Sequence, residues 1–121
     1  MLTWDETDVL AVLEVLPEED PHHIYHRYCV EKAGLRLIIT VWQYDGDVEF
    51  ELVDRTETRA SPAFKMKLVD CQGVQRRVDA SGEYLEFAPS ACFGGRYTPH
   101  TSIAYGVRVA VKPNIAISLF G

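Results

Sequence analysis

Apolar and polar residues alternate most regularly over residues 35–54, in the segment LRLIITVWQYDGDVEFELVD. A period of two predicts β-strands with one buried face. The dipeptide Asp45-Gly46 lies in the middle of this segment and is preferred in two-residue type I′ turns, so we expect a β-hairpin closed at that point. The register that follows places apolar residues on one face, with Val41 opposite Phe50 and Ile39 opposite Leu52.

The other face of this predicted hairpin is mixed in character. Residues 23–31 read as a preceding strand that turns into the hairpin near Gly34. The mixed face then collects the aromatic and arginine side chains that are enriched at protein interfaces: Tyr25, Arg27, Trp42 and Tyr44. Two interpretations stay open, a partner-binding surface or ordinary core covered by another layer of the fold.

The amino-terminal residues follow a helical period instead. Apolar side chains recur there at the i, i+3, i+4, i+7 spacing: Val9, Val12, Leu13 and Leu16. Thr3 followed by Glu6 fits a capping box, and Pro17 cannot continue a helix. These signals predict a helix over residues 4–16 that packs through its four apolar positions.

The remainder of the chain alternates in shorter runs, over residues 63–70, 74–78, 83–87 and 106–120. A turn over residues 80–82 aligns Val74 with Phe87 and Arg76 with Leu85. The two last strands share a face if residues 112–114 form a three-residue loop with Asn114 in the left-handed conformation.

One helix followed by about eight strands predicts an α+β fold. We expect the helix to pack on one mostly antiparallel, twisted meander sheet, and the alternative is a partly closed β-barrel plugged by the helix. The length of 121 residues fits a single domain over residues 1–121.

The net charge of −6 is concentrated at the amino-terminal end. The first 26 residues hold seven Asp or Glu and no Lys or Arg, whereas the rest of the chain is nearly neutral. Such a field repels nucleic acid and favours a partner with a basic surface, although a well-solvated helix carries similar charge. The chain has neither a long apolar run nor a signal-peptide pattern, so we expect a cytoplasmic protein that binds no membrane.

The histidines and cysteines give no metal-binding motif. Cys29, Cys71 and Cys92 are widely spaced, and we expect them to be reduced. His22, His23 and His26 precede Cys29, but residues four apart on a strand are about 13 Å apart. We therefore expect no metal and no cofactor, and place His26 at the margin of the apolar face, opposite Ile39.

Residues 88–105 are the one long stretch without a sustained period. Cys92 and His100 are candidates for a thiol–imidazole catalytic pair, and Gly94, Gly95 and Arg96 are candidates for binding a ligand. Their spacing matches no known nucleophile motif. The simpler interpretation is that the glycines form a turn and that Cys92 is a small buried residue.

These observations favour an interaction protein over an enzyme. The first hypothesis is an adaptor or inhibitor that binds a protein partner through the aromatic hairpin face and the acidic segment, with these acidic residues as candidates: Glu14, Glu18 and Glu19. The alternative is a small-ligand-binding protein or hydrolase with its site in the 88–105 loop. Self-association through a strand edge or the Trp42 face is open under either hypothesis.

Overall fold

The computed structural model describes residues 2–56, 62–90 and 95–121. Within these ranges, one short helix precedes a series of strands. In chain order the elements are α1 (Glu6–Leu13), β1 (Glu18–Glu19), β2 (His26–Lys32), β3 (Leu35–Trp42), β4 (Asp47–Asp54), β5 (Phe64–Leu68), β6 (Gly73–Asp79), β7 (Gly82–Ala88), β8 (Gly106–Ala110) and β9 (Ala116–Phe120).

The strands form two antiparallel sheets, which corrects the expectation of one meander sheet or a plugged barrel. The first sheet has the order β1-β2-β3-β4-β5 and the second has the order β6-β7-β8-β9. The chain leaves the first sheet after β5, where Asp70 has a positive φ of 55° and the backbone N–H of Gln72 donates to the carbonyl of Ala88 in β7. Alternation predicts strands but does not say which strands pair, so this crossing was invisible in the sequence.

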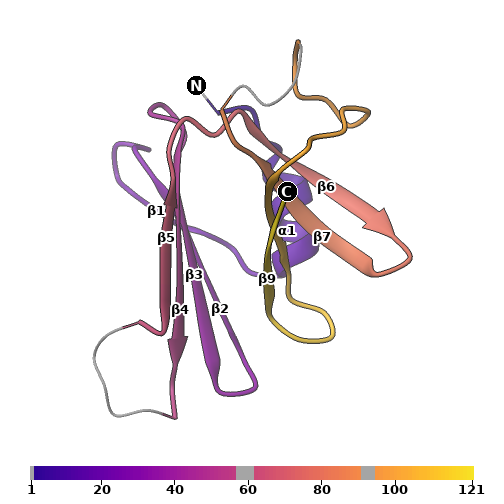
Figure 1. Ribbon diagram of the computed structural model, residues 1–121. Helices are drawn as coiled ribbons and strands as arrows, with labels where there is room; N and C mark the ends of the chain where they lie inside the picture. The colour runs from indigo at the N-terminus through magenta and orange to yellow at the C-terminus, as the bar shows by residue number, and fades with distance from the viewer. Residues whose placement is uncertain (1, 57–61, 91–94) are drawn as a thin grey trace.

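The inner faces of the two sheets pack against each other to form the core. The rings of Phe50 and Phe87 meet edge to face with centroids 4.9 Å apart, one from each sheet. Helix α1 contacts β6 and β7 and adds its apolar side chains to the same core. In Figure 1 the helix lies behind β7, so it closes the sandwich on that side.

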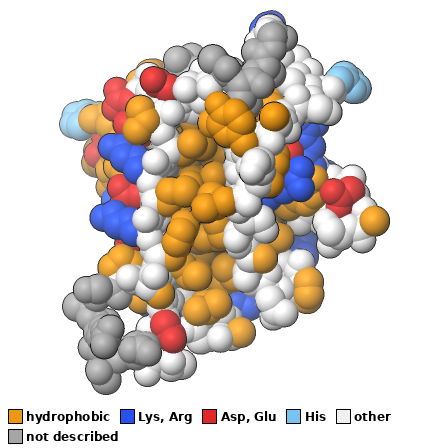
Figure 2. Space-filling view, in the orientation of Figure 1, with side chains coloured by type: hydrophobic (Ala, Val, Ile, Leu, Met, Phe, Trp, Pro, Cys, Tyr) orange, Lys and Arg blue, Asp and Glu red, His pale blue; other side chains and the backbone are white. Residues whose placement is uncertain are grey.

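On the opposite side of the sandwich, between the edge strands β5 and β9, no helix of the described residues covers the core. Figure 2 shows apolar side chains gathered there between the two sheets. Met66 and Leu68 of β5 and Ile117 of β9 are only partly buried against the core, and Leu119 is exposed. This band is an apolar surface on the outside of the molecule.

The β3–β4 hairpin differs from its predicted register by two residues. Val41 pairs with Val48, and the turn at Asp45 contains four residues because the backbone N–H of Gly46 donates to the carbonyl of Trp42 at 2.8 Å. Of the dipeptide's two residues only the glycine has a positive φ, whereas a type I′ turn needs both. A shift of two keeps the side chains of the paired strand residues on their predicted faces, so the division of the strands into apolar and mixed faces is confirmed, whereas Tyr44 lies in the turn.

The two-residue turn lies one hairpin earlier, between β2 and β3. Lys32 pairs with Leu35, and the intervening Ala33 and Gly34 both have positive φ, 52° and 80°. The β2–β3 register is therefore also displaced by two residues from the predicted one, and His26 pairs with Val41 instead of Ile39.

Helix α1 is shorter than predicted at both ends. Asp5 is the N-cap, and its side chain accepts the Thr7 N–H, so the expected capping box of Thr3 and Glu6 is wrong. The helix ends where Glu14 takes a φ of 60°, and Leu16 beyond it is 77% exposed. The three earlier apolar positions are buried as predicted: Val9, Val12 and Leu13. No helix in the described ranges has the length and apolarity that crossing a bilayer requires.

The hairpins of the second sheet follow the sequence closely. The β6–β7 register pairs Val74 with Phe87, as predicted. In the β8–β9 hairpin Val109 pairs with Ile117, which agrees with the predicted sharing of a face. Asn114 in the intervening loop does not have a positive φ, and the peptide bond before Pro113 is cis.

Candidate functional site

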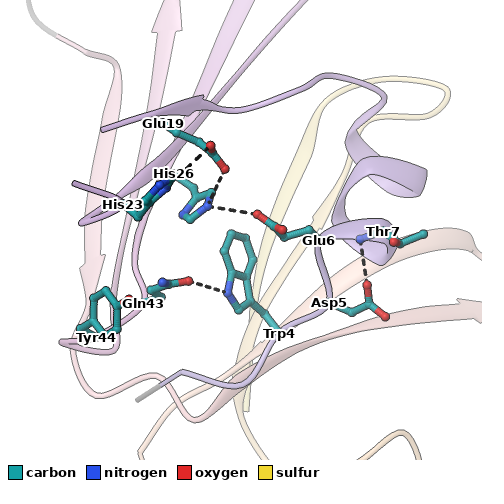
Figure 3. Close-up of a pocket in the computed structure, with 9 residues that line it drawn as sticks. All are labelled: Trp4, Asp5, Glu6, Thr7, Glu19, His23, His26, Gln43 and Tyr44. Carbon is teal, nitrogen blue, oxygen red and sulfur yellow. Dashed lines mark hydrogen bonds and ion pairs between the residues drawn. The ribbon is translucent and has the colours of Figure 1, made fainter. Parts of the chain in front are cut away.

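An open cleft of about 720 Å³ lies where the start of α1 meets the first sheet (Figure 3). Three parts of the chain line it: residues 4–7 at the helix start, the side chains of Glu19, His23 and His26 in and between β1 and β2, and residues 43–44 in the β3–β4 turn. Figure 3 shows acidic side chains from the helix and from β1 pointing toward the same histidine of β2. The cleft therefore joins segments that are distant in the sequence.

Local structure explains why these side chains meet. The N-cap at Asp5 fixes the first turn of α1 and places Glu6 beside β2. The short strand β1 pairs with β2 so that Glu19 lies opposite His26. At the other wall, the indole N–H of Trp4 donates to the side-chain oxygen of Gln43 at 3.3 Å, which holds the amino terminus against the hairpin turn.

His26 lies at the centre of the cleft and, among the described residues that line it, is the buried ionisable group. Its side chain is 5% exposed, and its Nε2 lies 3.0 Å from Oε1 of Glu6 and 2.9 Å from Oε1 of Glu19. The ring of Trp4 packs against it at a centroid distance of 4.9 Å and an interplanar angle of 79°. Its Nδ1 is buried and has no hydrogen-bond partner within the described residues.

The charges in this arrangement do not balance. One imidazole N–H can donate a good hydrogen bond to only one oxygen at a time, yet two carboxylates converge on it. Glu6 and Glu19 are 60% and 43% exposed at their side chains, and Oε2 of Glu19 also lies 3.9 Å from Nδ1 of the exposed His23. Even a protonated imidazole leaves one net negative charge in the trio, and Asp5 lies on the same wall. The cleft is suited to bind a cation.

The two carboxylates also affect Tyr28, which follows His26 by two residues on β2 and lies on the same inner face. Burial raises the pKa of the Tyr28 phenol above its ordinary value, and the negative charges of Glu6 and Glu19 raise it further. The hydroxyl has no hydrogen-bond partner within the described residues. The phenol therefore stays neutral beneath the cleft.

Two residues that were predicted separately come together here. Glu19 was a candidate from the acidic segment and Tyr44 from the aromatic hairpin face, and both line the cleft, with Tyr44 61% exposed. The other acidic candidates lie elsewhere, because Glu14 pairs with Lys112 at 3.4 Å and Glu18 is exposed on β1.

The remaining hairpin candidates lie on the outer face of the first sheet. The guanidinium of Arg27 lies over the ring of Tyr25 at 4.9 Å, and the Lys67 ammonium lies over the ring of Trp42 at 5.5 Å. Ion pairs cross this face between neighbouring strands, including the pair of Lys67 with Asp47 at 3.4 Å. The Trp42 face is thus a charged layer rather than a second core, and Tyr44 does not belong to it.

The loop candidates are not brought together in the described part of the chain. Cys92 and Gly94 lie outside the described residues, and Gly95, Arg96 and His100 are exposed. His100 lines a second cavity of about 290 Å³, but Arg96 does not. The structure therefore shows no Arg96–His100 site, and the thiol–imidazole pair stays a prediction.

The second cavity is built around Glu86, whose side chain is 6% exposed. Its carboxylate accepts from the Tyr97 hydroxyl at 2.8 Å and from Nη2 of Arg77 at 3.2 Å, and Nε of Arg108 lies 3.6 Å away. Arg77 also donates to backbone carbonyls of the loop, at Thr98, Pro99 and Thr101. This cluster anchors residues 97–101 to the second sheet.

Sequence reasoning missed both clusters, for different reasons. The predicted β6–β7 register already put Arg77 and Glu86 on one face, so their pairing could have been found by listing diagonal neighbours. The spacing of the histidines, in contrast, carries information only about the histidines themselves and about the nearby Cys29. Nothing in the chain between Glu6 and His26 indicates that the helix start would lie against β2.

The cysteines that the structure describes show different surroundings. Cys71 is buried, and burial raises the pKa of its thiol to about 12. Cys29 is exposed on the outer face of the first sheet. Cys71 is therefore a packing residue with little thiolate at neutral pH.

Comparison with known proteins gives a fold and no family. No protein-family model and no curated protein matches the chain. Among solved structures, the fold is similar to a chain of a contact-dependent growth inhibition toxin–immunity protein complex from Klebsiella pneumoniae 342, with a TM-score of 0.73 and 14% sequence identity. The match covers 98% of this chain and 95% of the other. At this identity the similarity shows that the two chains share a fold.

Proposed function

We propose that this protein binds and inhibits a protein partner with a basic surface, and that it receives a lysine or arginine side chain of the partner in the acidic cleft. The observation that carries the proposal is the convergence of Glu6 and Glu19, whose side chains are 60% and 43% exposed, on one buried histidine. Excess negative charge in a concave site favours the binding of a cation from outside the chain.

The walls of the cleft suit a guanidinium in particular. Carboxylates bind arginine through paired hydrogen bonds, and aromatic rings stack on its planar face. Trp4 and Tyr44 supply aromatic rings in the lining of the cleft, and Tyr44 is exposed. Tyrosine, tryptophan and arginine are also the residues that dominate binding energy at protein interfaces.

The fold comparison agrees with a protein that binds another protein. The similar chain belongs to a complex of a toxin with its immunity protein, so this architecture occurs in a protein that assembles with another protein. The concentration of acidic residues in the first 26 positions agrees with a basic partner, because opposite charge steers association.

The alternative site in the 88–105 loop is less favoured by its charges. The arginines of its cavity, Arg77 and Arg108, already face the buried carboxylate of Glu86. A ligand anion would have to compete with that carboxylate. Among the described residues, the acidic cleft holds no lysine or arginine, and its potential internal cations are the histidines His26 and His23, the latter with Nδ1 3.9 Å from Oε2 of Glu19.

A fluorescence titration with a short arginine-rich peptide tests the proposal. In a Trp42→Phe background Trp4 is the remaining tryptophan, and it lies in the cleft. We expect saturable quenching that weakens with salt, and about tenfold weaker binding for Glu6→Gln or Glu19→Gln.

The matched control is Glu14→Gln, which removes an equal charge from the same segment. Glu14 lies away from the cleft, where it pairs with Lys112. This variant should bind the peptide like the parent. If all three variants weaken binding equally, the peptide senses only net charge and the proposed site is wrong. If none does, the cleft does not bind the peptide.

A further inference from the structure

We propose that Glu6, Glu19 and His26 form a binding site for a divalent transition metal, Zn²⁺ by preference, with solvent completing the coordination. This inference does not depend on the proposed partner. It rests on the donor set, on the spacing of the donor atoms and on the burial of the histidine.

The donor atoms have the right identity and origin. An imidazole nitrogen and two carboxylate oxygens are ordinary zinc ligands, and three protein ligands with an open position are typical of accessible zinc sites. The three residues come from α1, β1 and β2, and their ligand atoms all lie within 4.8 Å of one another. A metal there would connect the three elements through their side chains.

The spacing is close to that of a tetrahedral site. With metal–ligand bonds of about 2.0–2.1 Å, the ligand atoms of tetrahedral zinc lie about 3.3 Å apart. Nε2 of His26 is 3.0 Å from the Glu6 oxygen and 2.9 Å from the Glu19 oxygen. The oxygens of the two glutamates lie within 4.8 Å of each other, so binding the ion requires these side chains to adjust, and both are exposed enough to do so.

The buried histidine gives the site a ligand of fixed orientation, which a pair of exposed acids lacks. Its side chain is 5% exposed and packed against the edge of Trp4, so its orientation toward the carboxylates is fixed before any ion arrives. Two carboxylates and a neutral imidazole carry a charge of −2, which a divalent ion neutralises. Without an ion, no group among these three residues can neutralise both negative charges.

The same features restrict the choice of metal. An imidazole ligand disfavours Mg²⁺ and Ca²⁺, which take oxygen ligands, and the absence of a sulfur ligand in the trio disfavours Cu(I). Metal on Nε2 places the ring proton on Nδ1, which lacks a partner within the described residues. Zinc-binding histidines usually donate that proton to an acceptor, so we expect weaker binding than at supported zinc sites.

Calorimetric titration of the full chain with zinc chloride tests the site. We expect one zinc per chain for the parent, no heat of binding with magnesium chloride, and at least about tenfold weaker zinc binding for Glu6→Gln or Glu19→Gln. The thermal unfolding midpoint of the parent should rise with zinc concentration, and that of Glu19→Gln should rise less.

Two control variants keep the result specific. Glu18→Gln and His22→Gln change neighbouring exposed residues that are not part of the trio, so both should bind zinc like the parent. Zinc should also shift the imidazole ¹⁵N signals of His26 in NMR spectra. Absence of zinc binding, or equal loss in the controls and the trio variants, would overturn the proposal while leaving the peptide titration unaffected.

Discussion

Glu86 in the second sheet and His26 in the first are both buried side chains that meet charged groups from other parts of the chain. Around Glu86, two arginines and a tyrosine hydroxyl surround one carboxylate. Around His26, two carboxylates surround one imidazole. The first cluster is supplied with its own counter-charges, and the second is left with a negative excess.

This difference separates a structural role from a binding role. The charged groups of the Glu86 cluster bind partners within the chain, because Arg77 donates to the backbone carbonyls of Thr98 and Thr101 as well as to the carboxylate. The His26 cluster keeps carboxylate oxygens exposed beside the aromatic rim of Trp4 and Tyr44. We therefore expect substitutions in the first to change stability and substitutions in the second to change binding.

The largest expected effect is a loss of stability in Arg77→Ala. Removing this guanidinium leaves the buried Glu86 carboxylate with only Arg108 and Tyr97, and breaking a buried ion pair from one side costs about 3 kcal/mol. Urea unfolding measures the change. A loss below about 1 kcal/mol would show that the cluster does not anchor the loop.

The next effect is on affinity in the cleft. Glu6→Gln and Glu19→Gln should each weaken arginine-rich peptide binding about tenfold while changing the unfolding free energy by less than about 1 kcal/mol, because both side chains are substantially exposed. Fluorescence titration and urea unfolding on the same samples give both values. A large stability loss with unchanged binding would reverse the assigned roles of the two clusters.

The third effect is a pH dependence that belongs to the Glu86 cluster. Burial raises the pKa of the Tyr97 phenol above its ordinary 10.0, and the hydrogen bond and negative charge of the Glu86 carboxylate raise it further. A raised pKa in the folded state means that the stabilisation is complete below about pH 10 and is lost as the pH rises above it. The unfolding free energy should therefore fall on the alkaline side.

Tyr97→Phe checks this assignment. It should lower stability at neutral pH by about 1 kcal/mol through the lost hydrogen bond to Glu86, and it should reduce the alkaline fall. The fall should not vanish, since the pKa of the buried Tyr28 is raised as well. An alkaline profile unchanged by the substitution would assign the dependence to other groups.

The smallest effect is expected for Arg76→Ala, the neighbour of Arg77 on β6. Arg76 pairs with Glu83 near the tip of the hairpin, where its side chain is exposed. Exposed pairs contribute about 0–1 kcal/mol, so the loss should be well below that of Arg77→Ala. Equal losses in the two variants would mean that charge on β6, and not the buried cluster, determines stability.

The sequence predicted the strands and their faces well because both depend on local alternation. Val74 pairs with Phe87 as expected, and Val9, Val12 and Leu13 form the buried face of the helix. Where the register was wrong, it was wrong by two residues, which preserves the face. The preference of Asp-Gly for a type I′ turn was overridden at Asp45-Gly46, where the carbonyl of Gly46 accepts a hydrogen bond from Cys71.

The division into two sheets and the composition of the cleft could not be predicted in the same way. Both depend on contacts between segments far apart in the chain, such as Gln72 with Ala88 and Glu6 with His26. The sequence did indicate Glu19 and Tyr44 as candidates from their residue types. It gave no sign that they would share a cleft with Trp4.

NMR chemical-shift mapping with the arginine-rich peptide tests the central claim most directly, because it locates the binding surface. We predict the largest shifts at the Trp4 indole N–H, at the His26 ring and at the backbone of residues 5–7 and 43–44, all around the cleft. Shifts centred instead on Arg27 and Trp42, on residues 95–105 or on the apolar band between β5 and β9 would contradict the account.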